Sequence, residues 1–438
     1  MIELIAIFLQ FCIFFIIFSF PFNPKNLNKL VNTKMHSINY IDCHAINIMV
    51  FINVLLVASF FKIHLNHIFI ALFLISIFFL IKRKNEYLLV MKRKNLLKFI
   101  FFFIVIIAMF INAANAPRLE WDGHHWITKA LVFFNNEPIQ NLKHTYMPEY
   151  PHLGGYIWAF FWKNSLLKYE YFGRLFQIYF YITSIFTIFN IVNFKSEKII
   201  YLLIFSLIII TYDPYLFGGY QEYLIFSTLL IASRFISQIN FNKNSPNKEI
   251  LLILFILSPL IWFKEEGIFY LLIFGSLLIF MQNFNIKKKI SYIIGMLFLI
   301  YTQHHLQKHV IGFYGFPVEF MTQTFVEQIT DFKIILLKFI AITKHILIAS
   351  IKYPLWIIII FSFLFLLFKN FYRKENYHFK YFLHAFLLNV CFVYAVYLHD
   401  PNPYEFILSV TLDRVIFQTS GLYLINMIFL VNMFKIKN

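Results

Sequence analysis

Long apolar runs alternate with short polar connections along almost the entire chain. A membrane-crossing helix needs about 20 mostly apolar residues, and the sequence offers thirteen runs of this general kind. The runs do not alternate apolar and polar positions as lipid-facing strands do, and a helix satisfies its own backbone hydrogen bonds in hydrocarbon. The pattern therefore predicts an all-α fold, a polytopic transmembrane helical bundle of about 13 spans. The candidate spans cover residues 2–20, 45–61, 66–81, 98–116, 172–194, 199–212, 222–239, 250–263, 267–285, 290–303, 353–369, 381–398 and 416–434.

One further apolar stretch, 335–350, is interrupted by Lys338, Lys344 and His345. About 16 residues with two lysines make a poor membrane crossing. We therefore expect this stretch to form an interfacial amphipathic helix and not a span.

Composition agrees with a membrane protein. Sixty per cent of the residues are hydrophobic, 13% are charged, and the mean hydropathy is +0.71. Soluble domains carry about 25% charged residues, so a soluble globular fold is excluded. The three cysteines, Cys12, Cys43 and Cys391, have no CxxC spacing, so neither a disulfide framework nor a zinc site is predicted.

Basic residues gather in every second connection and set an orientation. The 82–98 connection carries seven Lys or Arg residues and one acid, and the chain ends with Lys435 and Lys437. The positive-inside rule places these segments in the cytoplasm and the N-terminus outside. The net charge of +17 then reflects topology and lipid headgroups, and no nucleic-acid partner is predicted. The connections expected to face outward are 117–170, 213–221, 264–266, 304–352 and 399–415.

The first large outward connection carries an acid soon after a span. Asp122 lies between Trp121 and Trp126, and partial burial at a membrane surface raises the pKa of a carboxylate towards a value that suits a general base. An aspartate at this position is equally typical of a helix N-cap. Both roles stay open at this stage.

His124 and His125 follow Asp122 directly. Adjacent histidines point about 100° apart on a helix, so they seldom bind one ion together. A phosphate contact is favoured over a divalent metal, and no cofactor is predicted.

Other outward segments carry further candidate residues. Tyr150 lies in a turn between Pro148 and Pro151, and Glu222 opens a span. Charges this close to hydrocarbon are costly and are functional candidates by default, although a tight solvated turn, local pairing or snorkelling to the interface explains several of them as well. The cationic candidates for a phosphate are Lys264, His304 and Arg414.

Four short motifs resemble the GT-C superfamily of membrane glycosyltransferases, in particular bacterial relatives of the protein O-mannosyltransferases and of the lipid A aminoarabinose transferases. They are Trp121-Asp122 with Trp126 and Lys129-Ala130, then Tyr150-Pro151-His152-Leu153, then Gly219-Tyr220-Gln221-Glu222, and then Lys264-Glu265-Glu266-Gly267. The resemblance covers about residues 97–434. His152 replaces the second proline of the family's turn, and Glu222 stands where aspartate is more usual.

The resemblance implies a GT-C-like bundle with a helical first outer loop. It implies transfer of a sugar from a polyprenyl-phosphate carrier, with Asp122 as the catalytic base and Glu222 as a second carboxylate. On this reading residues 97–303 form the core, with the outer loop 117–170, after N-terminal helices and a basic loop in 1–96 and before an interfacial segment and C-terminal helices in 304–438. The resemblance leaves the first three spans unexplained.

The expected partners are a polyprenyl-phosphate-linked sugar donor, a lipid, glycan or protein acceptor, and membrane lipids. The expected location is a bacterial inner membrane, with the site facing the cell envelope. Two alternatives stay open: a lipid or oligosaccharide transporter or flippase, and a non-enzymatic membrane assembly protein. A transporter is expected to place ionisable residues at mid-span and to contain paired broken helices.

Overall fold

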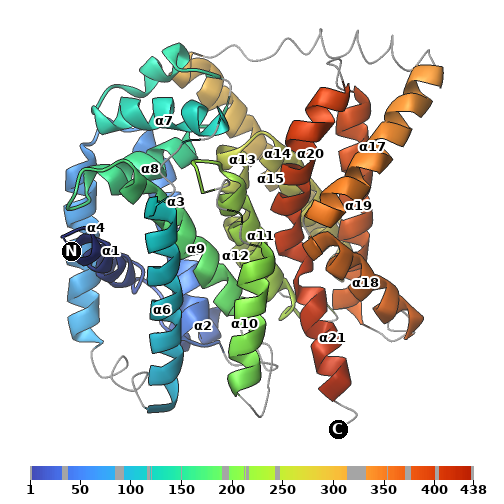
Figure 1. The fold of residues 1–438 in the computed structure, drawn as a ribbon, viewed down its shortest axis with the longest axis horizontal. Helices are drawn as coiled ribbons and strands as arrows, with labels where there is room; N and C mark the ends of the chain where they lie inside the picture. Colours follow the sequence, from blue (N-terminus) through green and yellow to red (C-terminus); the bar gives the residue numbers. More distant parts are fainter. Residues whose placement is uncertain are drawn as a thin grey trace.

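Helices make up the regular structure of this protein. The computed structural model describes residues 2–31, 38–83, 93–115, 119, 121–148, 150–189, 197–211, 213, 217–241, 247–312, 332–352, 354–369, 376–399 and 404–435. Within these ranges the chain forms helices and no strand (Figure 1), which confirms the all-α prediction.

The described helices follow one another along the chain. In chain order they are α1 (Ile2–Ile17), α2 (Pro24–Val31), α3 (Tyr40–Ser59), α4 (Leu65–Lys82), α6 (Arg93–Asn115), α7 (Trp121–Phe134), η1 (Ile139–His144), α8 (Leu153–Lys163), α9 (Tyr171–Ile188), α10 (Glu197–Thr211), α11 (Glu222–Ile236), α12 (Asn247–Leu257), α13 (Leu260–Phe263), α14 (Glu266–Met281), α15 (Ile286–Leu306), η3 (Gln307–Ile311), α17 (Phe332–Lys352), α18 (Pro354–Phe368), α19 (Tyr377–His399), α20 (Tyr404–Tyr423) and α21 (Ile425–Lys435).

Four of the described helices are long and apolar enough to cross a membrane: α3, α4, α17 and α19. Several others, including α1, α10, α14 and α18, are apolar but shorter. Helix length and composition thus support a membrane protein. The count of about 13 spans stays a prediction.

The stretch 335–350 differs from its prediction in length. It belongs to α17, which has 21 residues, and most of that helix meets the length and hydropathy of a membrane-crossing helix. The observed helix is therefore longer than the roughly 16 residues on which the interfacial expectation was based. The interfacial placement stays a prediction. Lys338 is buried, and its Nζ donates to the carbonyl oxygen of Leu398 at 3.3 Å, so this charged end has a polar partner inside the bundle.

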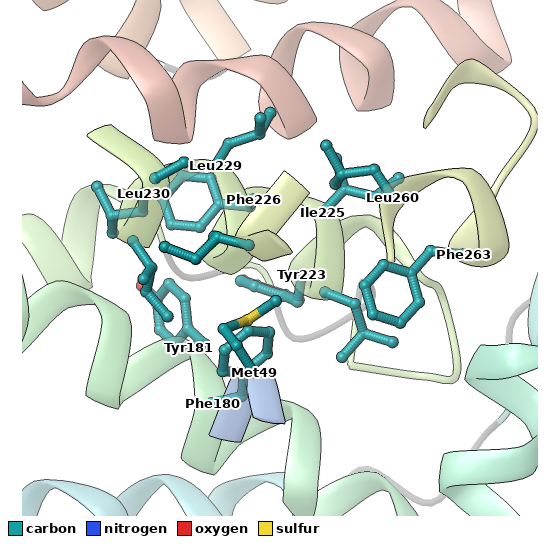
Figure 2. Packing of buried hydrophobic residues seen from close by; sticks show 14 of the residues in the cluster. Met49, Phe180, Tyr181, Tyr223, Ile225, Phe226, Leu229, Leu230, Leu260 and Phe263 are labelled. Atoms are coloured by element: carbon teal, nitrogen blue, oxygen red, sulfur yellow. The ribbon is translucent and has the colours of Figure 1, made fainter. Parts of the chain in front are cut away.

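Helix α11 lies at the centre of the packing, and every one of its residues is buried. Phe226 of α11 stacks on Phe417 of α20 with ring centroids 4.8 Å apart. Figure 2 shows the hydrophobic cluster around α11, with side chains from α3, α9 and α13: Met49, Phe180, Tyr181, Tyr223, Ile225, Phe226, Leu229, Leu230, Leu260 and Phe263. Residues from both halves of the chain therefore build one core.

Two helices, α7 and α8, follow α6 and lie together at one end of the bundle (Figure 1). The described part of the first large connection, 117–170, thus contains helices, as the sequence predicts. Helix α21 ends at the opposite end of the bundle (Figure 1). The two ends therefore differ in structure, and the candidate site lies at the end that carries α7 and α8.

Candidate functional site

A buried ion pair joins the beginning of α11 to the connection between α13 and α14. Lys264 Nζ donates to Glu222 Oε1 at 3.1 Å, and their side chains are only 9% and 1% exposed. The two residues are 42 positions apart in sequence. Burying either charge without its partner would be costly. The ion pair therefore holds the beginning of α11 next to the connection between α13 and α14.

Two further charges complete what we call the outer cluster, which consists of Glu222, Lys264, Glu266 and Arg414. Glu266 Oε1 lies 3.5 Å from Lys264 Nζ, and Arg414 Nη1 lies 3.8 Å from Glu222 Oε1. The guanidinium carbon of Arg414 also lies 5.0 Å from the ring centroid of Tyr220. Helices α11, α14 and α20 and the connection between α13 and α14 thus contribute two carboxylates and two cations.

The local sequence explains how Lys264 reaches this position. Pro259 follows the end of α12, where its missing N–H and its ring prevent the helix from continuing. The single turn α13 follows, and Lys264 then adopts an extended backbone with φ −151° and ψ 162°. The next helix begins two residues later. Lys264 therefore lies in a tight turn between two apolar helices, at the start of the three consecutive charged residues 264–266.

The electrostatic balance at Lys264 favours its charged form. Burial lowers the pKa of the ammonium group, but the carboxylates of Glu222 and Glu266 outweigh that effect and leave the pKa above its ordinary value. Lys264 thus stays protonated at neutral pH, which suits binding of an anion and does not suit a general base.

Glu222 keeps one oxygen unused. Its Oε1 accepts the lysine, whereas its Oε2 is buried and has no hydrogen-bond partner among the described residues. A buried carboxylate oxygen without a partner costs free energy, about 1–3 kcal/mol or more for a charged group. Such an atom is typical of a place where a ligand supplies the missing hydrogen bond.

The first turn of α7 packs against the turn that precedes Glu222. A Cβ at Gly123 would lie 2.3 Å from the carbonyl oxygen of Gly218, and one at Gly219, which has φ +108°, would lie 3.0 Å from Gly123 Cα. Only glycines allow the two backbones this close approach. Asp122, the predicted base, precedes Gly123 in α7. The structure does not describe the side chain of Asp122.

An aromatic layer connects α7 with the outer cluster. Tyr150 stacks on Trp126 with an interplanar angle of 13° and a centroid distance of 5.8 Å. The His125 ring lies 6.0 Å from that of Tyr150 and 4.6 Å from that of Tyr146. Tyr150 also contributes to the electrostatic environment of Lys264. Of the residues predicted to bind substrate, Tyr150 thus lies near Lys264, and His125 contacts Tyr150.

Two predicted site residues are not brought into the cluster. His124 is exposed on α7, and His304 is exposed in the last turn of α15. In the described part of the chain, no hydrogen bond, ion pair or ring contact joins either imidazole to Glu222, Lys264 or Arg414. A role for them at this site stays a prediction without a contact to support it.

A wall of rings closes the other side of the lysine connection. The His152 ring lies 5.2 Å from Phe60 and 5.6 Å from Trp262, and its Nε2 lies 2.7 Å from Ser59 Oγ. Burial, together with the charge of Lys129, lowers the pKa of His152 to about 3, so the imidazole stays uncharged at neutral pH. This histidine packs the first large connection against α3.

Sequence reasoning missed a second buried ion pair at the far end of α11. Arg234 donates from Nε and Nη2 to the two carboxylate oxygens of Asp42, each at 3.0 Å, and both side chains are completely buried. The available signal was a lone arginine inside the predicted span 222–239. Helix α11 therefore has a buried charge pair at each end. The distant pair joins the N-terminal helices to the core.

Gly267 permits the tight break that presents Lys264, and it gives a stability prediction. A Cβ at this position would lie 1.9 Å from the carbonyl oxygen of Leu260 and 2.9 Å from Ile261 N, both backbone atoms. We expect Gly267→Ala to lower the free energy of unfolding by about 1–3 kcal/mol, because α13 and α14 must move apart. Denaturation of the purified variant would measure this loss.

Gly295→Ala provides the matched control. Gly295 lies within α15, and a Cβ there meets nothing within 4 Å. This change should leave stability unaltered or raise it by up to about 1 kcal/mol, because alanine favours a helix over glycine. Equal effects of the two substitutions would show that the contact at Leu260 does not constrain the turn.

In the described ranges, no three His, Cys, Asp or Glu side chains group so as to hold a metal ion. The charges of the outer cluster suit recognition of an anion by Lys264 and Arg414 and of a hydroxyl by Glu222. Comparison with known proteins found no match for the chain among family models, curated proteins or solved structures.

Proposed function

We propose that the protein is a membrane glycosyltransferase of the GT-C type that moves a sugar from a polyprenyl-phosphate carrier to an acceptor. The observation that carries the proposal is the outer cluster, in which a buried carboxylate with one unused oxygen lies between two cations. A carboxylate and cations in one buried place suit a reaction that binds a hydroxyl and releases a phosphate.

The reaction balances with the residues at hand. The acceptor hydroxyl oxygen attacks the anomeric carbon, a new C–O bond forms, and the bond between that carbon and the phosphate oxygen breaks. Asp122 takes the hydroxyl proton, and the polyprenyl phosphate leaves with the electron pair. Direct displacement of this kind inverts the anomeric centre, and a phosphate leaving group requires no protonating acid of the kind used in ordinary glycoside hydrolysis.

Each cluster residue then has a role that its position supports. Arg414 and Lys264 attract the donor phosphate, and Glu222 Oε2 orients a hydroxyl of the acceptor or the sugar. Glu266 lies 3.5 Å from Lys264 Nζ and has a partly exposed side chain. The approaching phosphate displaces this weaker contact more readily than the buried pair with Glu222.

A multi-pass arrangement in a bacterial inner membrane completes the proposal, with about 13 spans, an outer N-terminus and a cytoplasmic C-terminus. The supporting observation is that α7 and α8 lie at one end of the bundle and α21 ends at the other (Figure 1). A green fluorescent protein fused after Lys437 should fluoresce, and alkaline phosphatase at the same point should be inactive. A phosphatase fusion after Asn164 should be active and serves as the control. An active phosphatase after Lys437 would refute this orientation.

The decisive test of the function is an assay with purified full-length protein in detergent and a panel of polyprenyl-phosphate sugars. We expect one donor to yield free polyprenyl phosphate, at a rate that an added acceptor raises. Lys264→Met should lower that rate by at least ~100-fold, as removal of a group that stabilises developing charge does. Lys287→Met, which removes an exposed lysine outside the cluster, should leave the rate unchanged.

A transporter or flippase is the alternative that this assay separates. Reconstituted protein that moves the lipid-linked sugar across vesicles without cleaving any donor would exclude the transferase. Donor cleavage that both lysine variants retain equally would show that the outer cluster is not the reaction site.

A further inference from the structure

A small pocket opens beside the outer cluster, between the α3–α4 connection and the end of α7. Its volume is about 230 Å³. Pockets for drug-sized ligands measure about 300–1,000 Å³, so this pocket fits one small group. The ring wall formed by Phe60, His152 and Trp262 stands between the pocket and Lys264, since Phe60 lines the pocket and lies 5.4 Å from Trp262. The pocket is therefore separate from the outer cluster.

The pocket is lined by groups that suit a hydroxylated ligand. The Tyr156 side chain is 2% exposed, and its hydroxyl is buried with no hydrogen-bond partner in the described residues. Asn136 and Gln140, which carry amides, and Phe133 also line the pocket. A buried hydroxyl without a partner favours a ligand that supplies one, and amides with an aromatic face are typical of sites that bind hydroxyl groups.

The charges of the pocket balance. Its lining residues include one lysine, Lys62, one carboxylate, Glu137, and one imidazole, His64. Glu137 Oε2 already accepts from Asn141 Nδ2 at 2.9 Å. The lining thus offers one positive and one negative side chain, and it lacks the two closely placed cations that hold an anion well. An uncharged headgroup fits better than a phosphate.

An apolar groove continues from the pocket along α3. The groove has a volume of about 550 Å³ and runs between α3 and Phe255 of α12. Phe61 and Ile63 line both the groove and the pocket, so the two spaces adjoin. Val57 and Phe61 are 60% and 61% exposed. Helix α3 is one of the four helices that are long and apolar enough to cross a membrane, so the groove faces the hydrocarbon when α3 does.

We propose that this combined space binds a glycolipid, with its uncharged, hydroxylated headgroup in the pocket and one hydrocarbon chain in the groove on α3. The unpartnered Tyr156 hydroxyl favours a headgroup with hydroxyl groups, and the balanced charges favour an uncharged one. The adjoining apolar groove favours a lipid over a free sugar. The proposal gives the N-terminal helices a ligand-binding role, and it does not depend on the reaction proposed above.

Photolabelling tests the proposal directly. Full-length protein would be reconstituted in phosphatidylcholine vesicles that contain a monoglucosyl diacylglycerol with a diazirine in one chain. Labelled peptides would be mapped by mass spectrometry. We expect preferential labelling of residues 50–61, which unlabelled monoglucosyl diacylglycerol competes away and phosphatidic acid with the same chains does not. Equal labelling of α3 by glycolipid, phosphatidic acid and phosphatidylcholine probes would overturn the proposal, because it would indicate unspecific lipid contact.

Two variants separate the headgroup from the chain. Tyr156→Phe removes only the hydroxyl and leaves no partner stranded, so the fold should persist while the glycolipid concentration needed for half-maximal labelling rises about fivefold. Val57→Trp fills the groove and should abolish labelling of residues 50–61. Leu297→Trp, at an exposed position of α15, is the control and should change nothing. Unaltered labelling in either Tyr156→Phe or Val57→Trp would overturn the proposal.

Discussion

Replacing Arg234 by methionine is expected to lower the free energy of unfolding by about 3–5 kcal/mol. The guanidinium makes two hydrogen bonds to Asp42, and both side chains are fully buried. Removing only the arginine leaves a carboxylate inside the bundle with its strongest partner missing. Reversible denaturation in mixed micelles, followed by circular dichroism, would measure the loss.

The double variant Asp42→Leu/Arg234→Met is the control for this prediction. Replacing both members of a buried ion pair by apolar residues is often neutral or stabilising. Asp42 also accepts a hydrogen bond from Asn39 N in the capping box of α3, so the double variant should stay about 1 kcal/mol less stable than the natural protein. A double variant as unstable as Arg234→Met alone would show that packing, and not the stranded charge, causes the loss.

Asp122→Asn is expected to lower the rate of sugar transfer by at least ~100-fold while leaving expression and stability nearly unchanged. The substitution keeps the size of the side chain, but it removes the group that accepts the proton under the proposed mechanism. Initial rates with the donor identified in the purified assay would measure the effect.

Glu405→Gln is the matched control, because Glu405 also lies in the first turn of a helix and is exposed. Its rate should equal that of the natural protein. Near-normal turnover by Asp122→Asn would show that Asp122, which lies in the first turn of α7, is not the base. Glu222, whose Oε2 has no partner within the described ranges, would then become the leading candidate for the base.

The sequence predicts the all-helical fold and the placement of charged residues at the ends of apolar helices, because both depend on local pattern. Apolar runs without strand alternation are sufficient for helices. The positions of Glu222 and Lys264 next to apolar runs mark them as costly charges, and the structure pairs them at 3.1 Å. Their catalytic and binding roles remain predictions, since contact alone does not assign chemistry.

Other features depend on tertiary packing and escape a pattern analysis. Helix α17 extends beyond the apolar stretch 335–350, and one of its lysines, Lys338, donates to a carbonyl oxygen of the neighbouring helix α19. His304 is exposed because of the direction in which its side chain leaves α15. The sequence does not show which face of this helix is turned to the core. The partnership of Asp42 with Arg234 depends on which helices become neighbours.

The distance between Asp42 and Arg234 along the chain also has a consequence for synthesis. The two residues are separated by 192 positions, and a ribosome adds about 5–20 residues per second, so Asp42 is made roughly 10–40 s before its partner exists. During that interval the capping box at Asn39 is the local interaction that can already satisfy part of the carboxylate. The N-terminal helices can therefore form this ion pair only after α11 has been synthesised. Until then they must remain in the membrane without it.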